Sequence, residues 1–261
     1  MNEMKKWKTL LVLVTSVLVL GGCQKVTPKE EAKDDKKEET VLYVTRHGKT
    51  IFNEMKKVQG WSDTPLTEPG IEVAKELGKG LKDEGLTFDY VYSSDAGRAR
   101  ETAQLVLEEL GQKDTVINES RDLREMFFGK FEGDLDEVMW GQAAQTLGYK
   151  DEADVKENLK VLGLEKITDA MAENDETGQF ETYAELRERV QGQLTDIAKE
   201  VEEKGGGNIL VVSHGMAISA FLSDLTDEDT DRPLPNASVS KVIYKDGSFD
   251  VQSIGDTSYI E

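Results

Sequence analysis

Short apolar runs alternate with amphipathic stretches along most of this chain. Residues 41–44 and 209–212 are almost uninterrupted runs of apolar side chains, and polar residues follow each of them. Such runs are typical of buried parallel strands, which are covered on both faces. Residues 88–92 alternate apolar and polar side chains and then open into two serines, which predicts a third strand.

Helices are predicted between these strands. Residues 67–84 carry apolar side chains at three- and four-residue spacing, with Thr67 in the position of an N-cap. Residues 99–110 and 182–203 show the same period, and each stretch ends at glycine. Residues 216–225 predict a further helix directly after the second apolar strand.

The order of these elements predicts an α/β fold. Strands that alternate with helices form a mostly parallel central sheet with helices on both faces. Residues 238–244 and 248–254 flank a Lys-Asp-Gly turn and predict a closing β-hairpin. Residues 133–181 are acidic and helical in places, so we expect them to form an inserted helical lid or cap. Ligands of such sheets bind beyond the carboxyl ends of the strands, where polar residues become site candidates.

The first 23 residues have the pattern of an export signal. Three lysines precede an apolar run over residues 10–20, and two glycines and Cys23 follow it. The run is shorter than the roughly 20 apolar residues of a membrane-spanning helix. Residues 20–23 resemble a bacterial lipobox, which implies a lipid on Cys23 that anchors an extracytoplasmic protein to the cell membrane. A plain secreted protein or an uncleaved membrane anchor is the alternative.

Composition divides the rest of the chain into a tether and a domain. Residues 24–40 have almost no apolar side chains and mix lysine with acidic residues, which predicts a flexible tether. Residues 41–261 are long enough for one domain with a substantial core. The whole chain has a formal net charge of −20, which disfavours binding to nucleic acid. A phosphate site would therefore need a local concentration of positive charge.

Two histidines stand out because each directly follows an apolar strand. His47 is followed by Gly48, and His214 is followed by Gly215, so the backbone can approach a ligand closely at both places. A single buried histidine is usually a structural residue. Two histidines at strand ends, both before glycine, favour a functional site.

Five motifs around these histidines resemble those of the histidine phosphatase superfamily, also called the phosphoglycerate mutase-like family. Each motif is weak alone, but they occur in family order over residues 41–215, and residues 236–244 resemble the family's closing strand. The motifs are Arg46-His47-Gly48 with Thr50 and Asn53; Gln59-Gly60-Trp61-Ser62-Asp63-Thr64-Pro65-Leu66-Thr67 with Gly70; Ser93-Ser94-Asp95 with Arg98-Ala99 and Thr102-Ala103; Leu123-Arg124-Glu125 with Gly129 and Glu132-Gly133; and Ser213-His214-Gly215.

The resemblance implies phosphoryl transfer through His47. In this view His47 is the nucleophile, Glu125 is the general acid and base, and His214 donates a hydrogen bond to the phosphoryl group. One departure from the family pattern is Lys49, where many members carry glutamate. Lys49 is either an additional phosphate contact or a charge at the rim of the site.

The resemblance also implies the substrate-binding residues. Arg46 and Arg98 would bind phosphate oxygens, because a guanidinium fork matches phosphate geometry and stays charged. Asn53 would add a neutral donor, and Gln59 and Gly60 would complete the substrate site. No cofactor or metal is expected, because both histidines are assigned, the single cysteine lies in the export signal and no acidic spacing resembles a calcium loop.

Three functions share these residues. A phosphatase would hydrolyse small phosphorylated molecules through phosphohistidine, whereas a phosphoglycerate mutase would return the phosphoryl group to a sugar acid. The third alternative is a tethered receptor that binds phosphorylated ligands without chemistry. Export favours the phosphatase, since a glycolytic mutase needs cytosolic substrate. An intact nucleophile with its acid argues against the receptor.

The insertion has its own charge pattern. Between residues 134 and 181 there are thirteen acidic residues against four lysines. If this segment covers the site, we expect it to disfavour polyanionic substrates relative to small monophosphates. The alternative is that it packs away from the site and its charge serves solubility.

Overall fold

The computed structural model describes residues 38–260. The predicted export signal, with Cys23, and most of the predicted tether lie outside these residues, so the lipid anchor stays a prediction. Within the described range, no helix is both long enough and apolar enough to cross a membrane.

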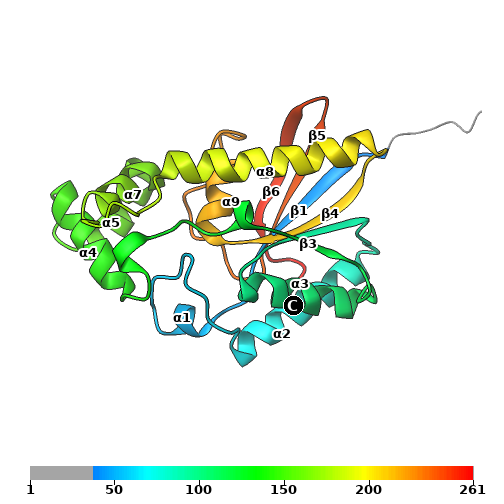
Figure 1. The fold of residues 1–261 in the computed structure, drawn as a ribbon, viewed down its shortest axis with the longest axis horizontal. Coiled ribbons are helices and arrows are strands. Elements are labelled where there is room, and N and C mark those ends of the chain that lie inside the picture. Colours follow the sequence, from blue (N-terminus) through cyan, green and yellow to red (C-terminus); the bar gives the residue numbers. More distant parts are fainter. Residues whose placement is uncertain (1–37, 261) are drawn as a thin grey trace, which may run out of the picture. The chain divides into compact units, whose positions relative to one another are not determined.

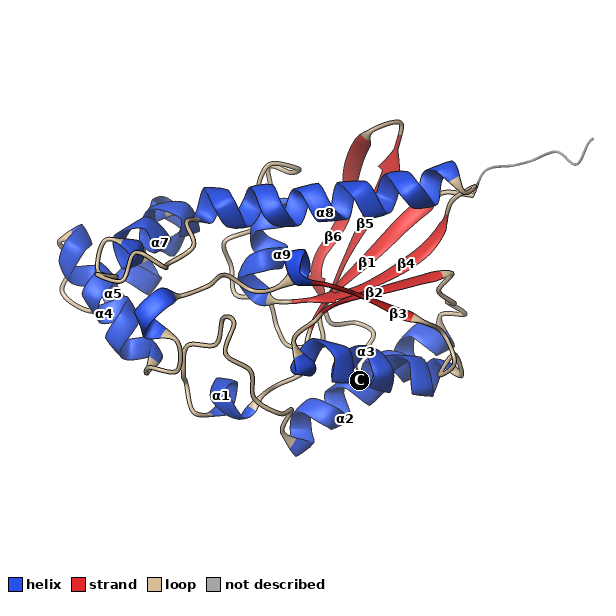
Figure 2. Cartoon of the chain, in the orientation of Figure 1, coloured by secondary structure: helices blue, strands red, loops and turns tan. Residues whose placement is uncertain are grey.

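A six-stranded mixed sheet forms the centre of the domain, as Figures 1 and 2 show. Its spatial order is β3-β2-β4-β1-β5-β6, in which the first four strands are parallel and the last two are antiparallel to their neighbours. The predicted α/β fold with a mostly parallel sheet is therefore confirmed. The strands are β1 (Thr40–Arg46), β2 (Tyr90–Ser94), β3 (Ile117–Ser120), β4 (Gly207–Ser213), β5 (Val239–Lys245) and β6 (Ser248–Asp256).

Helices cover both faces of this sheet (Figure 1). One face carries α8 (Tyr183–Glu203) and α9 (Gly215–Leu222), and the other carries α2 (Glu68–Asp83) and α3 (Gly97–Leu110). Two hydrophobic cores result, one on each side of the sheet. The strands in the middle of the sheet are buried on both faces, which explains their unbroken apolar sequences.

Local sequence signals fix several element ends. The Thr67 hydroxyl accepts a hydrogen bond from the Gly70 N–H and caps α2. At the start of α8, Thr182 and Glu185 cap each other's backbone N–H groups reciprocally. The turn between β5 and β6 has positive φ at both Asp246 and Gly247, as a two-residue hairpin requires.

One strand and one short α-helix of the main domain were not predicted from the sequence. The edge strand β3 is only four residues long and leaves its side chains partly or fully exposed. It therefore lacks the apolar run from which a strand is predicted. The short helix α1 (Ile51–Glu54) contains no buried residue, and a capping box formed by Thr50 and Asn53 defines it instead. The strand predicted at residues 88–92 begins later, at Tyr90, and Phe88 before it packs edge-on against Tyr43 in the core.

The insertion folds into four short helices. These are α4 (Asp136–Leu147), α5 (Glu152–Glu157), α6 (Leu159–Leu162) and α7 (Leu164–Ala172). In Figure 1 they form a group near the N-terminal end of α8, beyond the carboxyl ends of β1 and β4. Met139, Ile167 and Met171 bury their side chains in the core that lies under α8 and α9. The insertion is thus continuous with the main core.

Candidate active site

Strand pairing brings the two histidines together. Arg46 at the end of β1 stands opposite Ser213 at the end of β4, so the next residue of each strand is a histidine. The N–H of His47 donates to the carbonyl of Ser213 over 3.0 Å, and the centroids of the His47 and His214 rings are 5.1 Å apart. Two residues far apart in sequence therefore face each other at the carboxyl edge of the sheet.

The hydrogen bonds of His47 define the state of its imidazole ring. Nδ1 lies 2.7 Å from the carbonyl oxygen of Gly48. Because that oxygen only accepts, Nδ1 carries the proton and Nε2 keeps its lone pair, which accepts from Nε of Arg98 at 3.2 Å. Burial lowers the pKa of His47 well below its usual 6.5, and the charges of Arg98 and Arg46 lower it further. The ring is therefore neutral near pH 7, with Nε2 ready to act as a nucleophile.

Arg98 is held by hydrogen bonds on all five of its N–H donors. Only 1% of the residue is exposed, at the start of α3. Asp63 is its ion-pair partner at 2.9 Å and also accepts from the Gly97 N–H, so one carboxylate both caps α3 and fixes the guanidinium. The five donors go to His47 Nε2, His214 Nδ1, Asp63 Oδ1 and the carbonyls of Gly60 and Ser62.

Arg98 also decides the tautomer of His214. A guanidinium can only donate, so Nδ1 of His214 accepts from it at 2.9 Å and the proton sits on Nε2. Burial and the neighbouring arginine lower the pKa of His214 well below 6.5, which keeps the ring neutral. Its Nε2–H is buried and has no hydrogen-bond partner in the described part of the chain.

A second buried donor, Nε of Arg46, also has no partner among residues 38–260. The other end of this guanidinium donates to the carbonyl of Leu234. The Nε atom lies against Gly215, where an added Cβ would be 3.5 Å away. An unpaired buried donor costs about 1–3 kcal/mol. Two such donors, on Arg46 and His214 next to His47, form a site that an anion would complete.

The side-chain carboxylate of Glu125 caps the N-terminus of α9. Its Oε1 accepts from the N–H groups of Met126 and Ala217, at 2.9 and 3.0 Å, and its Oε2 accepts from Met216 at 3.0 Å. Burial raises the pKa of Glu125, while these N–H groups and the two buried arginines oppose the rise. A carboxyl with a raised pKa holds its proton closer to neutral pH, as a general acid requires.

Asn53 and Gln59 are placed by a shared contact with Thr50. The backbone N–H of Thr50 donates to Oδ1 of Asn53 at 3.2 Å, which leaves the Nδ2 donor for the cavity that this residue lines. The Thr50 hydroxyl donates to Oε1 of Gln59, whose Nε2 donates to Thr64 at 2.9 Å. Gln59 thus fixes the loop before it and also lines the cavity.

Gly60 has both backbone polar groups engaged within the protein. Its carbonyl accepts from Arg98, and its N–H donates to Glu132 at 3.2 Å. A Cβ at this position would collide with Glu132 and with the Met126 carbonyl, so only glycine fits. In the described arrangement Gly60 positions Arg98, and a direct contact with substrate stays a prediction.

Several positioning residues were quoted in motifs but received no role from the sequence. Glu132 accepts backbone N–H groups from the loop after Gly60, and Asp63 holds Arg98. Asn236 donates to the His47 carbonyl at 2.9 Å. The Thr102 hydroxyl accepts from the Gly48 N–H at 3.0 Å. Their presence inside or beside the motifs was the available signal, and only the tertiary contacts show what each one does.

Lys49 lies at the surface rather than among the residues of the cavity. Its side chain is 41% exposed, and its Nζ lies 3.5 Å from Oε2 of Glu54. In the described arrangement Lys49 is therefore a rim charge with a surface ion pair. Within residues 38–260, no group of three His, Cys, Asp or Glu side chains is arranged to hold a metal ion.

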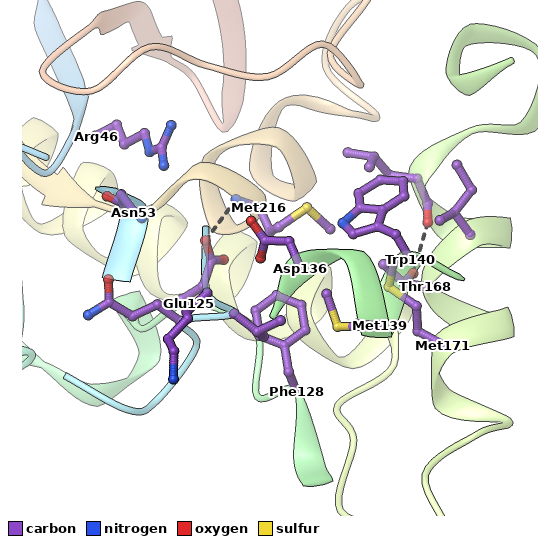
Figure 3. A pocket seen from close by; sticks show the side chains of 15 residues that line it. Arg46, Asn53, Glu125, Phe128, Asp136, Met139, Trp140, Thr168, Met171 and Met216 are labelled. Carbon is purple, nitrogen blue, oxygen red and sulfur yellow. Dashed lines mark hydrogen bonds between the residues drawn. The ribbon is translucent and has the colours of Figure 1, made fainter. Parts of the chain in front are cut away.

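A cavity of about 200 Å³ opens beside these groups (Figure 3). One part of its lining is polar and includes Arg46, Asn53, Gln59 and Glu125. The insertion supplies another part, which is mostly apolar. It includes Met139 and Trp140 from α4 and Leu164, Ile167, Thr168 and Met171 from α7. The insertion therefore packs against the site, and its one acidic residue in the lining is Asp136.

Comparison with known proteins gives consistent matches. The model of the histidine phosphatase superfamily (branch 1) matches residues 42–158 and 134–257. A 2,3-bisphosphoglycerate-dependent phosphoglycerate mutase of Parvibaculum lavamentivorans is 42% identical over 105 residues, which are 39% of this chain and 50% of that protein. The chain thus spans half the length of this relative. A probable phosphoglycerate mutase GpmB of Yersinia pestis is 28% identical over 84% of this chain and 94% of its own.

A solved structure is also similar. The crystal structure of phosphoglycerate mutase from Bacillus anthracis str. Sterne has a TM-score of 0.81 and 40% sequence identity. The match covers 87% of this chain and 97% of that chain.

Proposed function

The chain belongs to the histidine phosphatase superfamily, and we propose that it hydrolyses small phosphomonoesters through a phosphohistidine on His47. Members of this superfamily include phosphoglycerate mutases and phosphatases. The observation that carries the proposal is the ring state of His47: its proton is held on Nδ1 by the Gly48 carbonyl, and Nε2 keeps its lone pair among buried donors. A receptor that only bound phosphate would not need a neutral nucleophile there.

In the first step, Nε2 of His47 attacks phosphorus, and the P–N bond forms as the bond to the alcohol oxygen breaks. Nε of Arg46 and Nε2–H of His214, which lack partners among the described residues, would each donate to a phosphoryl oxygen. Arg98 would exchange its contact with His47 Nε2 for a contact with another oxygen. Positive charge and fixed donors stabilise a phosphoryl group in transfer. Glu125 gives its proton to the leaving oxygen.

In the second step, water attacks the phosphohistidine. Glu125, now ionised, takes a proton from that water, the P–N bond breaks, and neutral His47 is restored. The same carboxyl therefore acts first as acid and then as base. Two arginines next to Glu125 stabilise its ionised form between the steps.

A mutase is the second candidate, because relatives with 42% and 40% identity carry that name. In that reaction a hydroxyl of a bound sugar acid replaces water. The lining of the cavity favours hydrolysis over the mutase reaction. Asp136 is part of this lining, and its carboxylate would repel the carboxylate of a bound phosphoglycerate. Lys57 also lines the cavity, but it is already engaged within the protein, because its Nζ donates to the Gly133 carbonyl at 3.0 Å.

Product analysis separates these two functions. We expect inorganic phosphate from 4-nitrophenyl phosphate and from simple alkyl phosphates at each turnover. With 3-phosphoglycerate and a bisphosphorylated primer, we expect isomerisation to be slower than phosphate release by at least about tenfold. This is the size of effect that one mismatched group produces in a pocket. Faster isomerisation than phosphate release would assign the protein to the mutases.

We further propose that the mature protein begins at Cys23 and is held at the outer face of the membrane by a lipid on that residue. The charged start, the apolar run and the small residues before Cys23 support this proposal. The polar stretch after Cys23 would serve as the spacer between lipid and domain.

Replacing Cys23 with serine tests the anchor. We expect Cys23→Ser to move the protein from the membrane fraction to an uncleaved or soluble form, because serine offers no thiol for lipid attachment. Mass spectrometry of the mature wild-type chain should find the lipid on residue 23. An unmodified Cys23 in the mature protein would refute the anchor and leave the proposed chemistry intact.

A further inference from the structure

The wall of the cavity formed by the insertion differs chemically from the phosphoryl site. It presents thioether, aliphatic and aromatic side chains, among them Met139, Trp140, Leu164, Ile167 and Met171. Such a wall binds the carbon skeleton of a ligand by removing apolar surface from water. It offers few donors to a sugar or to another alcohol rich in hydroxyl groups.

One carboxylate, that of Asp136, lies within this apolar wall. Figure 3 shows the Asp136 side chain pointing into the cavity beside Met216. Burial raises the pKa of Asp136, and the lysines that oppose this rise, Lys156 and Lys56, form no salt bridge with it in the described residues. A partly buried carboxylate without a partner is unfavourable.

Two of the nearby lysines already have partners. Lys57 lines the cavity, but its Nζ donates to the Gly133 carbonyl at 3.0 Å. Lys156 pairs with Glu152 at 3.0 Å. The cavity therefore contains one carboxylate that these neighbouring cations leave without a direct ion pair.

We infer that the cavity selects phosphomonoesters whose alcohol part is apolar and carries a positively charged nitrogen, with Asp136 as the counter-ion of that nitrogen. This inference rests on the proposed phosphatase function and specifies its substrate class. An alkylammonium group fits both features of the wall: its carbon atoms pack on apolar side chains, and its charge meets the carboxylate. A carboxylated alcohol would meet repulsion at the same place.

Asp136 also occupies the first turn of α4, where an acidic side chain stabilises the helix through the macrodipole. Glu137 stands in the same turn, is exposed and does not line the cavity. It is therefore the matched control, because a purely helical role would be shared by both residues.

The test uses two substrates of the same shape. Phosphocholine carries a quaternary nitrogen, and 3,3-dimethylbutyl phosphate has carbon in its place. We expect wild-type kcat/KM to be at least about tenfold higher for phosphocholine, from one desolvated contact of a cation with its counter-ion and apolar neighbours. In Asp136→Asn the ratio should fall to within about twofold. In Glu137→Gln it should stay at the wild-type value.

Equal wild-type rates on the two substrates would overturn the inference, and so would an unchanged ratio in Asp136→Asn. In either case, phosphate release from both substrates would leave the proposed phosphatase function standing. If neither these substrates nor 4-nitrophenyl phosphate releases phosphate, the proposed function itself fails, and the inference fails with it. Thermal unfolding of each variant shows whether it is folded, and the wild-type ratio does not depend on any variant.

Discussion

His47→Ala is expected to lower kcat by about 10⁴-fold or more, because it removes the atom that receives the phosphoryl group. Alanine would lose the ring's contacts with the Gly48 carbonyl, His214 and Arg98, all of which lie at the carboxyl edge of the sheet. The variant should therefore keep its fold, which circular dichroism and thermal unfolding would show. Turnover of 4-nitrophenyl phosphate measures the loss directly.

A trapping experiment identifies the modified residue. Wild-type enzyme quenched during turnover of labelled substrate should carry label that is stable in base and lost in acid, as phosphohistidine is. His214→Ala is the matched control. The His214 ring is also neutral, but its nitrogen without a partner among the described residues is Nε2, which carries the proton and has no lone pair. This variant should react more slowly and still carry the label on His47. Label on His214, or acid-stable label on serine or aspartate, would contradict the assignment.

The pH dependence of labelling follows from the lowered pKa of His47. A histidine is nucleophilic only when neutral, and burial with two adjacent arginines keeps this ring neutral well below pH 6.5. We therefore expect His47 to become protonated, and to lose its nucleophilicity, only when the pH falls well below 6.5. Between about pH 6 and 8 this group should impose no change on the labelling rate.

The sequence was sufficient to place His47, the proposed nucleophile, at the end of a strand because the physical signals there are local. A histidine that directly follows an apolar strand lies at the carboxyl end of that strand. The pairing of His47 with His214 then depends only on β1 and β4 being neighbours in register, which the structure shows through the Arg46–Ser213 pair. Helix ends were equally local, as the Thr67 cap shows.

Other features depend on contacts between distant segments and could not be read from the sequence. The tautomer of His214 is set by Arg98, and Arg98 is set by Asp63 and by the Gly60 carbonyl, so three separate loops must first be placed. The role of the insertion was open for the same reason: its acidic composition gave no clue that apolar residues of α4 and α7 line the cavity. The exposed strand β3 lacked any apolar pattern.

Glu125→Gln is expected to lower turnover of alkyl phosphates by about 10³-fold, within the usual range for losing a general acid. Glutamine has nearly the same shape, and its amide oxygen can keep the N–H groups of Met126 and Ala217. Its amide nitrogen cannot accept from Met216, so stability should fall by about 1–2 kcal/mol. Thermal unfolding measures this cost separately. Asp122→Asn, an exposed acid on the same loop, should leave both activity and stability unchanged.

The choice of leaving group separates the two roles of Glu125. Nitrophenolate leaves without a proton, so phosphorylation of His47 by 4-nitrophenyl phosphate should be much less affected in Glu125→Gln than phosphorylation by an alkyl phosphate. The second step still needs a base, so phosphohistidine should accumulate. Rapid mixing should then show a burst of about one nitrophenolate per enzyme followed by slow turnover. A uniform loss with both classes of substrate and no burst would mean that Glu125 only positions α9.

The pH dependence of activity is an independent test of the role of the Glu125 carboxyl. Because burial raises its pKa, Glu125 holds its proton at low pH and loses it as the pH rises through that raised value. The wild-type kcat/KM for alkyl phosphates should therefore fall toward alkaline pH, since the first step needs the protonated acid. Glutamine does not titrate, so this alkaline fall should be absent in Glu125→Gln, while ionisation of the substrate affects both proteins equally. An alkaline fall of the same midpoint in the variant would assign the titration to another group.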